Sequence, residues 1–148
     1  MYMNSLEYAI NMEMESKKFY LEQAEKTADN GLRSIFTTLA EEESIHARIL
    51  KNKEETLPYE LIDTYAEIKN IFVEIGSYKS LIEQLPDGAD VYRLALENER
   101  KSVALYKEIL DSAIDDKDKK ILTFLIEQEQ DHCKVIEQLV EMVNRPKS

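Results

Sequence analysis

Two short stretches of the sequence decide the fold: Leu39–Leu50 reads LAEEESIHARIL and Leu125–Ile136 reads LIEQEQDHCKVI. Each contains one of the two histidines of the chain, preceded by a glutamate three residues earlier. Residues separated by three positions lie on the same face of an α-helix. Apolar residues at spacings of three and four surround both pairs, so the sequence predicts that they lie on the buried faces of two helices. The two pairs are Glu43 with His46 and Glu129 with His132.

These pairs belong to a repeat of the chain at an interval of 86 residues. The same shift superimposes Glu13 on Glu99, and in each half this glutamate precedes the Glu-x-x-His pair by 30 residues. Each half is therefore predicted to be a helical hairpin with one glutamate on its first helix and Glu-x-x-His on its second. Two such hairpins related by a pseudo-twofold axis would bring four carboxylates and two imidazoles together in the core. Further matched pairs are Ser16 with Ser102 and Tyr20 with Tyr106.

The remaining pattern predicts a single all-α domain over residues 1–148. The chain has only three glycines and three prolines, and it lacks the alternation of apolar and polar residues that is typical of strands. Asn30 and Gly31 are expected to end the first helix. The helices are expected at about 5–29, 32–53 and 89–112, and from a start within 115–118 to about 143.

A long connection separates the two hairpins, which span about 5–53 and about 88–144. It covers about 54–87, and a structureless connection of that length is unusual in a small bundle. Helical spacing from Leu61 to Ile75 predicts that it is partly helical. Because the connection is long enough to cross the whole bundle, the third helix is expected to run parallel to the second.

Composition and charge narrow the class of protein. A net charge of −11 argues against a nucleic-acid surface. No apolar run approaches the roughly 20 residues that span a bilayer, and the N-terminus lacks the features of a signal peptide. The single cysteine, Cys133, excludes an intrachain disulfide framework and a Cys-x-x-Cys metal site. We therefore expect a soluble cytoplasmic protein with no nucleic-acid or membrane partner.

The core register of these residues predicts a metal site. Four unpaired carboxylates in a bundle core would each cost several kcal/mol and would repel one another. Two divalent cations would offset that charge, and a donor set of carboxylates and imidazoles suits Fe, Mn or Zn. Glu43 and Glu129 share their helices with the histidines and are the expected bridging ligands, which leaves Glu13 and Glu99 as terminal ligands.

For other residues near these positions the sequence supports weaker predictions. Tyr20 and Tyr106 lie two turns beyond Glu13 and Glu99, and their hydroxyl groups are predicted to donate hydrogen bonds to ligand carboxylates of the opposite hairpin. The alternative is that they are ordinary core aromatic residues. Glu42 and Gln128, each one turn before a histidine, are weaker candidates for supporting the ligands, and one or both are expected to be exposed. Cys133 is expected to be a packing residue.

The sequence resembles the ferritin-like superfamily of di-iron carboxylate proteins, and most closely the rubrerythrin group. The matching stretches cover all four predicted helices but not the connection; they are AINMEMESKKFY (9–20), LAEEESIHARIL (39–50), ALENERKSVALY (95–106) and LIEQEQDHCKVI (125–136). The resemblance implies an up-down-down-up four-helix bundle with two iron ions. The ligands that it implies are Glu13, Glu43, His46, Glu99, Glu129 and His132.

The resemblance also implies a class of activity. Rubrerythrin-like proteins reduce hydrogen peroxide or oxidise ferrous iron with O₂, often as homodimers, and protect against oxidative stress. We therefore expect a di-iron oxidoreductase that acts on H₂O₂ or O₂. The alternatives are a ferroxidase or iron-binding protein and a structural bundle with a redox-silent metal.

Two departures from the rubrerythrin pattern bear on this expectation. Rubrerythrins carry a further glutamate three residues past the terminal ligand of their third helix, and that position is Ser102 here. The resemblance therefore does not extend to the ligand exchange that this glutamate performs. The Cys-x-x-Cys pairs of a rubredoxin domain are also missing from the 148 residues, so a separate electron donor, such as a rubredoxin-like protein, is expected.

Overall fold

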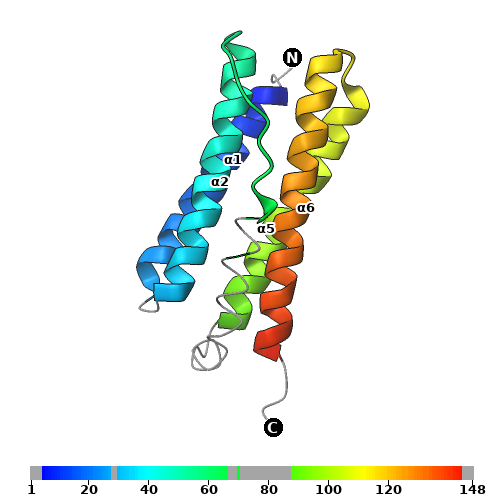
Figure 1. Ribbon diagram of the computed structural model, residues 1–148. Coiled ribbons are helices and arrows are strands. Elements are labelled where there is room, and N and C mark those ends of the chain that lie inside the picture. The colour runs from blue at the N-terminus through cyan, green and yellow to red at the C-terminus, as the bar shows by residue number, and fades with distance from the viewer. Residues whose placement is uncertain (1–4, 28–29, 67–69, 71–87, 145–148) are drawn as a thin grey trace.

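The computed structural model describes residues 5–27, 30–66, 70 and 88–144, and these residues form a four-helix bundle (Figure 1). Both hairpins are present, because α1 packs along α2 and α5 packs along α6. The chain runs in opposite directions in α1 and α2, and α5 runs parallel to α2, as Figure 1 shows. The predicted all-α fold of two repeated hairpins is therefore confirmed. The helices are α1 (Ser5–Lys26), α2 (Asn30–Glu54), α5 (Gly88–Ser112) and α6 (Asp116–Asn144).

The boundary between the first two helices differs from the prediction. The first helix, α1, ends at Lys26 rather than at about Asp29, and Asn30 and Gly31 begin α2 instead of stopping α1. A side chain from α2 explains part of this difference, because the guanidinium of Arg33 donates a hydrogen bond of 2.9 Å to the carbonyl oxygen of Thr27. That bond satisfies the carbonyl oxygen of Thr27, which would accept a backbone N–H if the helix continued.

The described part of the connection, residues 55–66, runs over the face between α2 and α6 (Figure 1). Residues 57–64 are irregular, so the prediction of a helix beginning at Leu61 is wrong. Leu61 instead packs on the apolar core, and Asp63 accepts a hydrogen bond of 3.1 Å from the side chain of Gln128 on α6. Residues 65, 66 and 70 are helical, and the rest of the predicted crossover helix lies outside the described residues.

The core consists of two apolar clusters on either side of a polar layer. One cluster includes Tyr20, Phe36 and Leu39, and the other includes Leu50 and Leu125. Each helix passes from one cluster to the other, and the repeated glutamates and histidines lie between the two. Among the described residues, no helix is both long and apolar enough to cross a membrane.

Candidate metal centre

Six ionisable side chains meet in the polar layer between the two apolar clusters. Each of the four helices contributes, with one glutamate from α1, one from α5, and a Glu-x-x-His pair from each of α2 and α6. All six are at most 1% exposed, whereas charged side chains are rarely buried without a partner. The sequence thus predicted the position of all six: Glu13, Glu43, His46, Glu99, Glu129 and His132.

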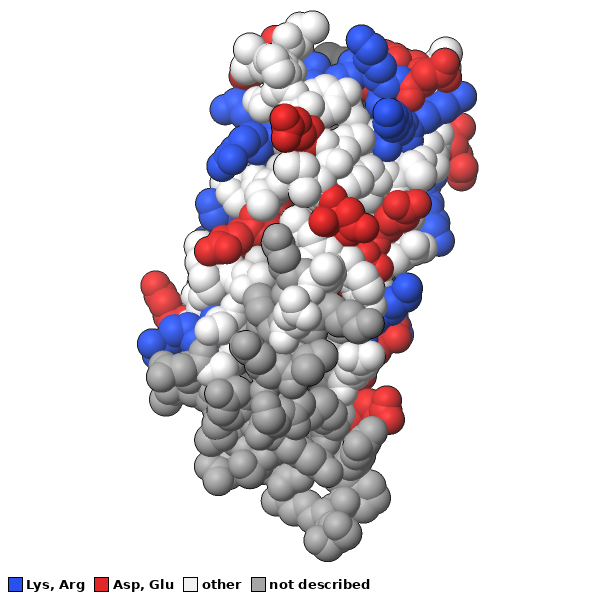
Figure 2. Space-filling model, viewed as in Figure 1, with Lys and Arg blue, Asp and Glu red and all other residues white. Residues whose placement is uncertain are grey.

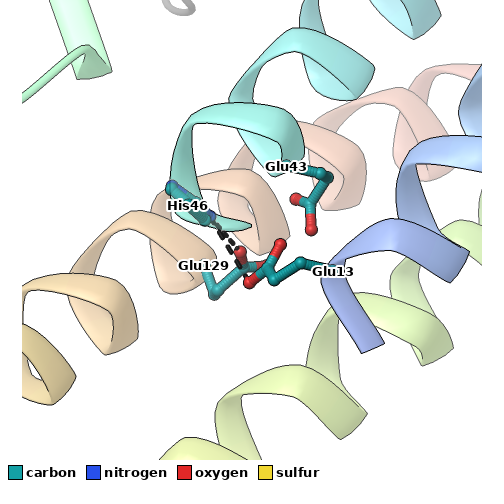
Figure 3. A group of neighbouring side chains, drawn as sticks. All are labelled: Glu13, Glu43, His46 and Glu129. Carbon is teal, nitrogen blue, oxygen red and sulfur yellow. Dashed lines mark hydrogen bonds and ion pairs between the residues drawn. The ribbon is translucent and has the colours of Figure 1, made fainter. Parts of the chain in front are cut away.

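These residues form two overlapping groups, each able to surround one ion. In each group the ligand atoms all lie within 4.8 Å of one another. Glu43 and Glu129 belong to both groups. The first group adds Glu13 and His46 and is drawn in Figure 3, and the second adds Glu99 and His132. This sharing is the arrangement that two bridging and two terminal carboxylates require.

The two imidazole rings lie side by side with their Nδ1 atoms toward the carboxylates. The ring centroids are 5.7 Å apart and the ring planes are inclined by 15°. His46 Nδ1 lies 2.8 Å from Glu129 Oε1 and 3.5 Å from Glu13 Oε1 (Figure 3). His132 Nδ1 lies 3.3 Å from Glu43 Oε1 and 3.5 Å from Glu99 Oε2. Each histidine therefore offers one nitrogen to the space that the carboxylates surround.

Buried polar atoms without partners show that the donor set fits metal ions. Each of the six residues has at least one buried side-chain oxygen or nitrogen with no hydrogen-bond partner among the described residues, and both oxygens of Glu43 are in this state. Leaving such an atom unpaired costs about 1–3 kcal/mol, and more when it is charged. Oxygen and imidazole donors of this kind suit Fe, Mn or Zn.

The electrostatics of the four carboxyl groups divide them into two pairs. Burial, together with the neighbouring carboxylates, raises the pKa of Glu43 and of Glu129 well above the usual range. Burial also opposes the ionisation of Glu99, but its interactions with Glu129 and His132 prevail and hold its pKa at about 2. Glu13 behaves similarly, since the effects of Glu43 and His46 exceed that of burial and lower its pKa. The raised pKa values favour the protonated forms of the two shared glutamates, so cations would compete with protons for these oxygens.

Two tyrosines hold the other two carboxylates in place. The hydroxyl of Tyr20 donates a hydrogen bond of 2.5 Å to Glu99 Oε1, and that of Tyr106 donates one to Glu13 Oε1. Both bonds join opposite hairpins, as the sequence predicted. Burial and the neighbouring carboxylates raise the pKa of both hydroxyl groups well above 10, so they remain donors. Glu99 thus turns Oε1 to Tyr20 and Oε2 to His132, whereas in Glu13 the same Oε1 accepts from Tyr106 and faces His46, and Oε2 is buried without a partner.

The substitution Tyr106→Phe is expected to lower the free energy of unfolding by about 1–3 kcal/mol, because it leaves a buried oxygen of Glu13 without its donor. Tyr8→Phe is the matched control, since Tyr8 is 48% exposed on the same helix as Glu13. It should change stability by no more than about 0.5 kcal/mol. Urea denaturation of the metal-free proteins measures both values. Equal stabilities of the two variants would show that the hydrogen bond from Tyr106 to Glu13 does not stabilise the fold.

Glu42 and Gln128 are both buried, although at least one of them was expected to be exposed. Glu42 is 5% exposed and Gln128 is 3% exposed, so that expectation is wrong. The irregular part of the connection explains the burial of Gln128, whose side chain bonds Asp63 and also accepts a hydrogen bond of 3.0 Å from Thr64. The thiol of Cys133 packs in the apolar core, as expected, and burial raises its pKa to about 12.

One hydrogen bond between the hairpins was not predicted from the sequence. The side-chain amide of Asn98 on α5 donates a hydrogen bond of 2.8 Å to the hydroxyl of Ser16 on α1. The signal lay in the repeat, because the counterpart of Asn98 in the first half is Met12. A polar residue that replaces an apolar counterpart beside a ligand position marks a place where the symmetry is broken.

Ser102 occupies the position at which a further glutamate would provide a seventh ligand. Its side chain is 1% exposed, and its hydroxyl donates a hydrogen bond of 3.3 Å to the carbonyl oxygen of Asn98 within α5. The serine therefore fills the place beside Glu99 with a short neutral group. No further carboxylate joins the two groups of ligands among the described residues.

Comparison with known proteins agrees with this geometry. A protein family model described as rubrerythrin matches residues 4–140, which include the first hairpin, all but the last four residues of the second, and all six residues of the site. Curated proteins and solved structures yield no match to the chain.

Proposed function

This chain belongs to the rubrerythrin family, and from that premise we propose that it is a ferritin-like di-iron oxidoreductase that reduces hydrogen peroxide or reacts with O₂. The observation that carries the proposal is the pair of overlapping Glu/His groups, which share Glu43 and Glu129. Two bound Fe(II) ions would supply the two electrons that, with two protons from water, convert one hydrogen peroxide molecule to two water molecules and leave two Fe(III) ions.

The ligand roles follow from the two groups. We assign Glu43 and Glu129 as bridging ligands because they belong to both groups. Glu13 with His46, and Glu99 with His132, then serve as the terminal ligands. Manganese and zinc suit the same donors, so the proposal of iron rests on the family and not on the donor atoms.

The surrounding residues keep the ligands in place and keep bulk water out. Apolar clusters close the layer on both sides, and a low local dielectric strengthens the attraction between carboxylates and cations. The hydroxyls of Tyr20 and Tyr106 prevent Glu99 and Glu13 from rotating away from the site. Their raised pKa values keep the phenolic protons on oxygen throughout the physiological range.

Ser102 favours a second candidate, a ferroxidase that oxidises ferrous iron with O₂ as part of iron binding. A serine hydroxyl bonded to its own helix cannot follow a change of charge at the metals as a mobile carboxylate could. The two candidates differ in the fate of the iron after its oxidation. An oxidoreductase is reduced again by an outside donor, whereas an iron-binding protein retains further iron in an assembly.

The test is an anaerobic titration of the Fe(II)-loaded protein with H₂O₂. Two Fe(II) ions in one site should consume one H₂O₂ as a pair, so no hydroxyl radical should reach a spin trap. Free Fe(II) reacts one electron at a time and releases the radical. We expect a ratio of one peroxide to two Fe(II), followed by further turnovers when a rubredoxin-like protein or a chemical reductant is supplied.

Three results would count against this proposal. A radical yield equal to that of free Fe(II) would show that the ions do not act as a pair. Retention of many irons per chain in a large assembly, seen by size-exclusion chromatography, would favour the ferroxidase. A metal that changes neither oxidation state nor peroxide concentration would leave a structural role only. Size-exclusion chromatography also tests the expectation of a homodimer.

A further inference from the structure

A cavity of about 700 Å³ lies at the end of the bundle where α2 stops and α6 begins. Its size falls within the range of small-molecule sites, which are about 300–1,000 Å³. It is distinct from the metal centre, because Lys53 on its wall lies seven residues past His46, about 10 Å farther along the helix. None of the residues that bind or support the proposed metals lines it.

The charged part of this cavity consists of lysines. Lys53, Lys117 and Lys120 line it, and among the residues that the structure describes no acidic side chain does. Lys53 is partly balanced, since its ammonium lies 3.4 Å from Asp118 and 3.7 Å from Asp115. Neither Lys117 nor Lys120 has an ion-pair partner within the part of the chain that the structure describes. Their two charges are therefore available to an anion.

The two lysines lie close together near the start of α6. Both are exposed in the first turns of α6, where Asp116 and Asp118 offset part of the positive potential of the helix dipole. Asp115 already accepts the backbone N–H of Lys117 at 2.8 Å, so the ammonium groups remain as the main donors for a ligand. Figure 2 shows blue side chains on both sides of this upper end of the molecule, with some red side chains among them, and further red side chains across its middle.

The opposite wall of the cavity is apolar and fixed in shape. Tyr59 and Leu61 line it and pack on the core cluster that contains Leu50. The chain before them is held by two hydrogen bonds of Asn52, whose carbonyl accepts from Leu57 N at 2.7 Å and whose side chain donates to Pro58 O at 3.1 Å. The wall thus exists before a ligand binds, which lowers the entropic cost of binding.

We propose that this cavity binds a phosphorylated heteroaromatic ligand of mononucleotide size. Its phosphate lies between Lys117 and Lys120, and its ring packs against Tyr59 and Leu61. Lysine ammonium groups bind phosphate as point charges, and an aromatic ring matches an apolar wall that carries a tyrosine. The site is independent of the proposed metal chemistry, so either conclusion can fail without the other.

The test is calorimetric titration of the full, metal-loaded chain with flavin mononucleotide and with adenosine monophosphate at low ionic strength. At least one of them should bind with one molecule per chain. Its form without phosphate, riboflavin or adenosine, should bind at least tenfold more weakly. Binding should also weaken when salt is raised from about 0.05 M to about 0.5 M, because salt screens the lysines.

Matched variants locate the site. Lys117→Gln/Lys120→Gln should weaken binding at least tenfold, and Tyr59→Ala should weaken it while leaving the preference for the phosphorylated form. Lys101→Gln/Lys134→Gln removes the same charge from exposed positions outside the cavity and should change affinity less than twofold. The proposal is overturned if neither nucleotide binds, if the two double variants behave alike, or if inorganic phosphate binds as tightly as the nucleotide.

Discussion

The double variant Glu43→Gln/Glu129→Gln is expected to lose metal binding and yet to be more stable than the wild-type protein when both are free of metal. Both changes keep the volume of the side chain and remove its charge. Loss of a partner outside the ligand shell already weakens metal binding about 10–100-fold, so replacement of both shared ligands should exceed that effect. Equilibrium dialysis with Fe(II) or Mn(II) measures the loss.

The gain in stability follows from the raised pKa values of the two glutamates. Burial and neighbouring carboxylates raise both pKa values above the reference value of 4.5, so the folded metal-free state must hold protons that the unfolded chain releases at neutral pH. That requirement lowers wild-type stability as pH rises above about 4.5. Glutamine removes it, so the variant should be more stable than the wild-type protein at pH 7 and should gain nothing from this cause at pH 4.

The matched control is Glu41→Gln/Glu127→Gln. These residues are related by the same repeat, lie two positions before the shared ligands, and are exposed. They should change neither metal affinity nor the dependence of stability on pH. Parallel losses of stability and metal binding in the Glu43/Glu129 variant would instead mean that the carboxylates support the fold without metal.

Metal loading is expected to raise the melting temperature by at least about 10 °C. Each ion present at 1,000 times its dissociation constant stabilises the folded state by about 4 kcal/mol, and each kcal/mol raises the melting temperature of a domain of this size by about 2–4 °C. Calorimetry before and after treatment with a chelator measures the difference. Adding Mg²⁺, which prefers oxygen ligands and keeps several of its waters, should restore much less than Fe(II) or Mn(II).

The control for this experiment is the Glu43→Gln/Glu129→Gln protein, whose melting temperature should not respond to metal or chelator. An equal response of the two proteins would place the stabilising ions elsewhere on the acidic surface. A wild-type melting temperature that ignores chelator would contradict the two-metal site, because ions that bind only the folded state must stabilise it.

The candidate site could be predicted from sequence because two independent signals, the repeat and the helical register, coincide. The repeat relates Glu43 to Glu129 and His46 to His132, the helical register places them on the core faces, and the same register selects Glu13 and Glu99 from the other glutamates. Glu15 shows the value of the register, since it lies on the same helix as Glu13 and is exposed. The hydrogen bonds of Tyr20 and Tyr106 followed from the same faces.

The features that could not be predicted depend on contacts without a periodic pattern. The early end of α1 involves a guanidinium from the next helix, and the burial of Gln128 depends on the irregular segment of residues 57–64. Helical spacing from Leu61 onward suggested a helix, but tertiary bonds to Asp63 and Thr64 hold this segment in another conformation. The cavity beside Lys117 likewise arises from the turn after α2, whose geometry leaves no spacing signal.

The most direct test of the two-metal site is the number of ions per chain. The wild-type protein is saturated with Fe(II) under anaerobic conditions, passed through a desalting column, and assayed for iron and protein by elemental analysis. The overlapping groups that share Glu43 and Glu129 predict two irons per chain. One iron or fewer per chain, or two that persist in the Glu43→Gln/Glu129→Gln variant, would contradict it.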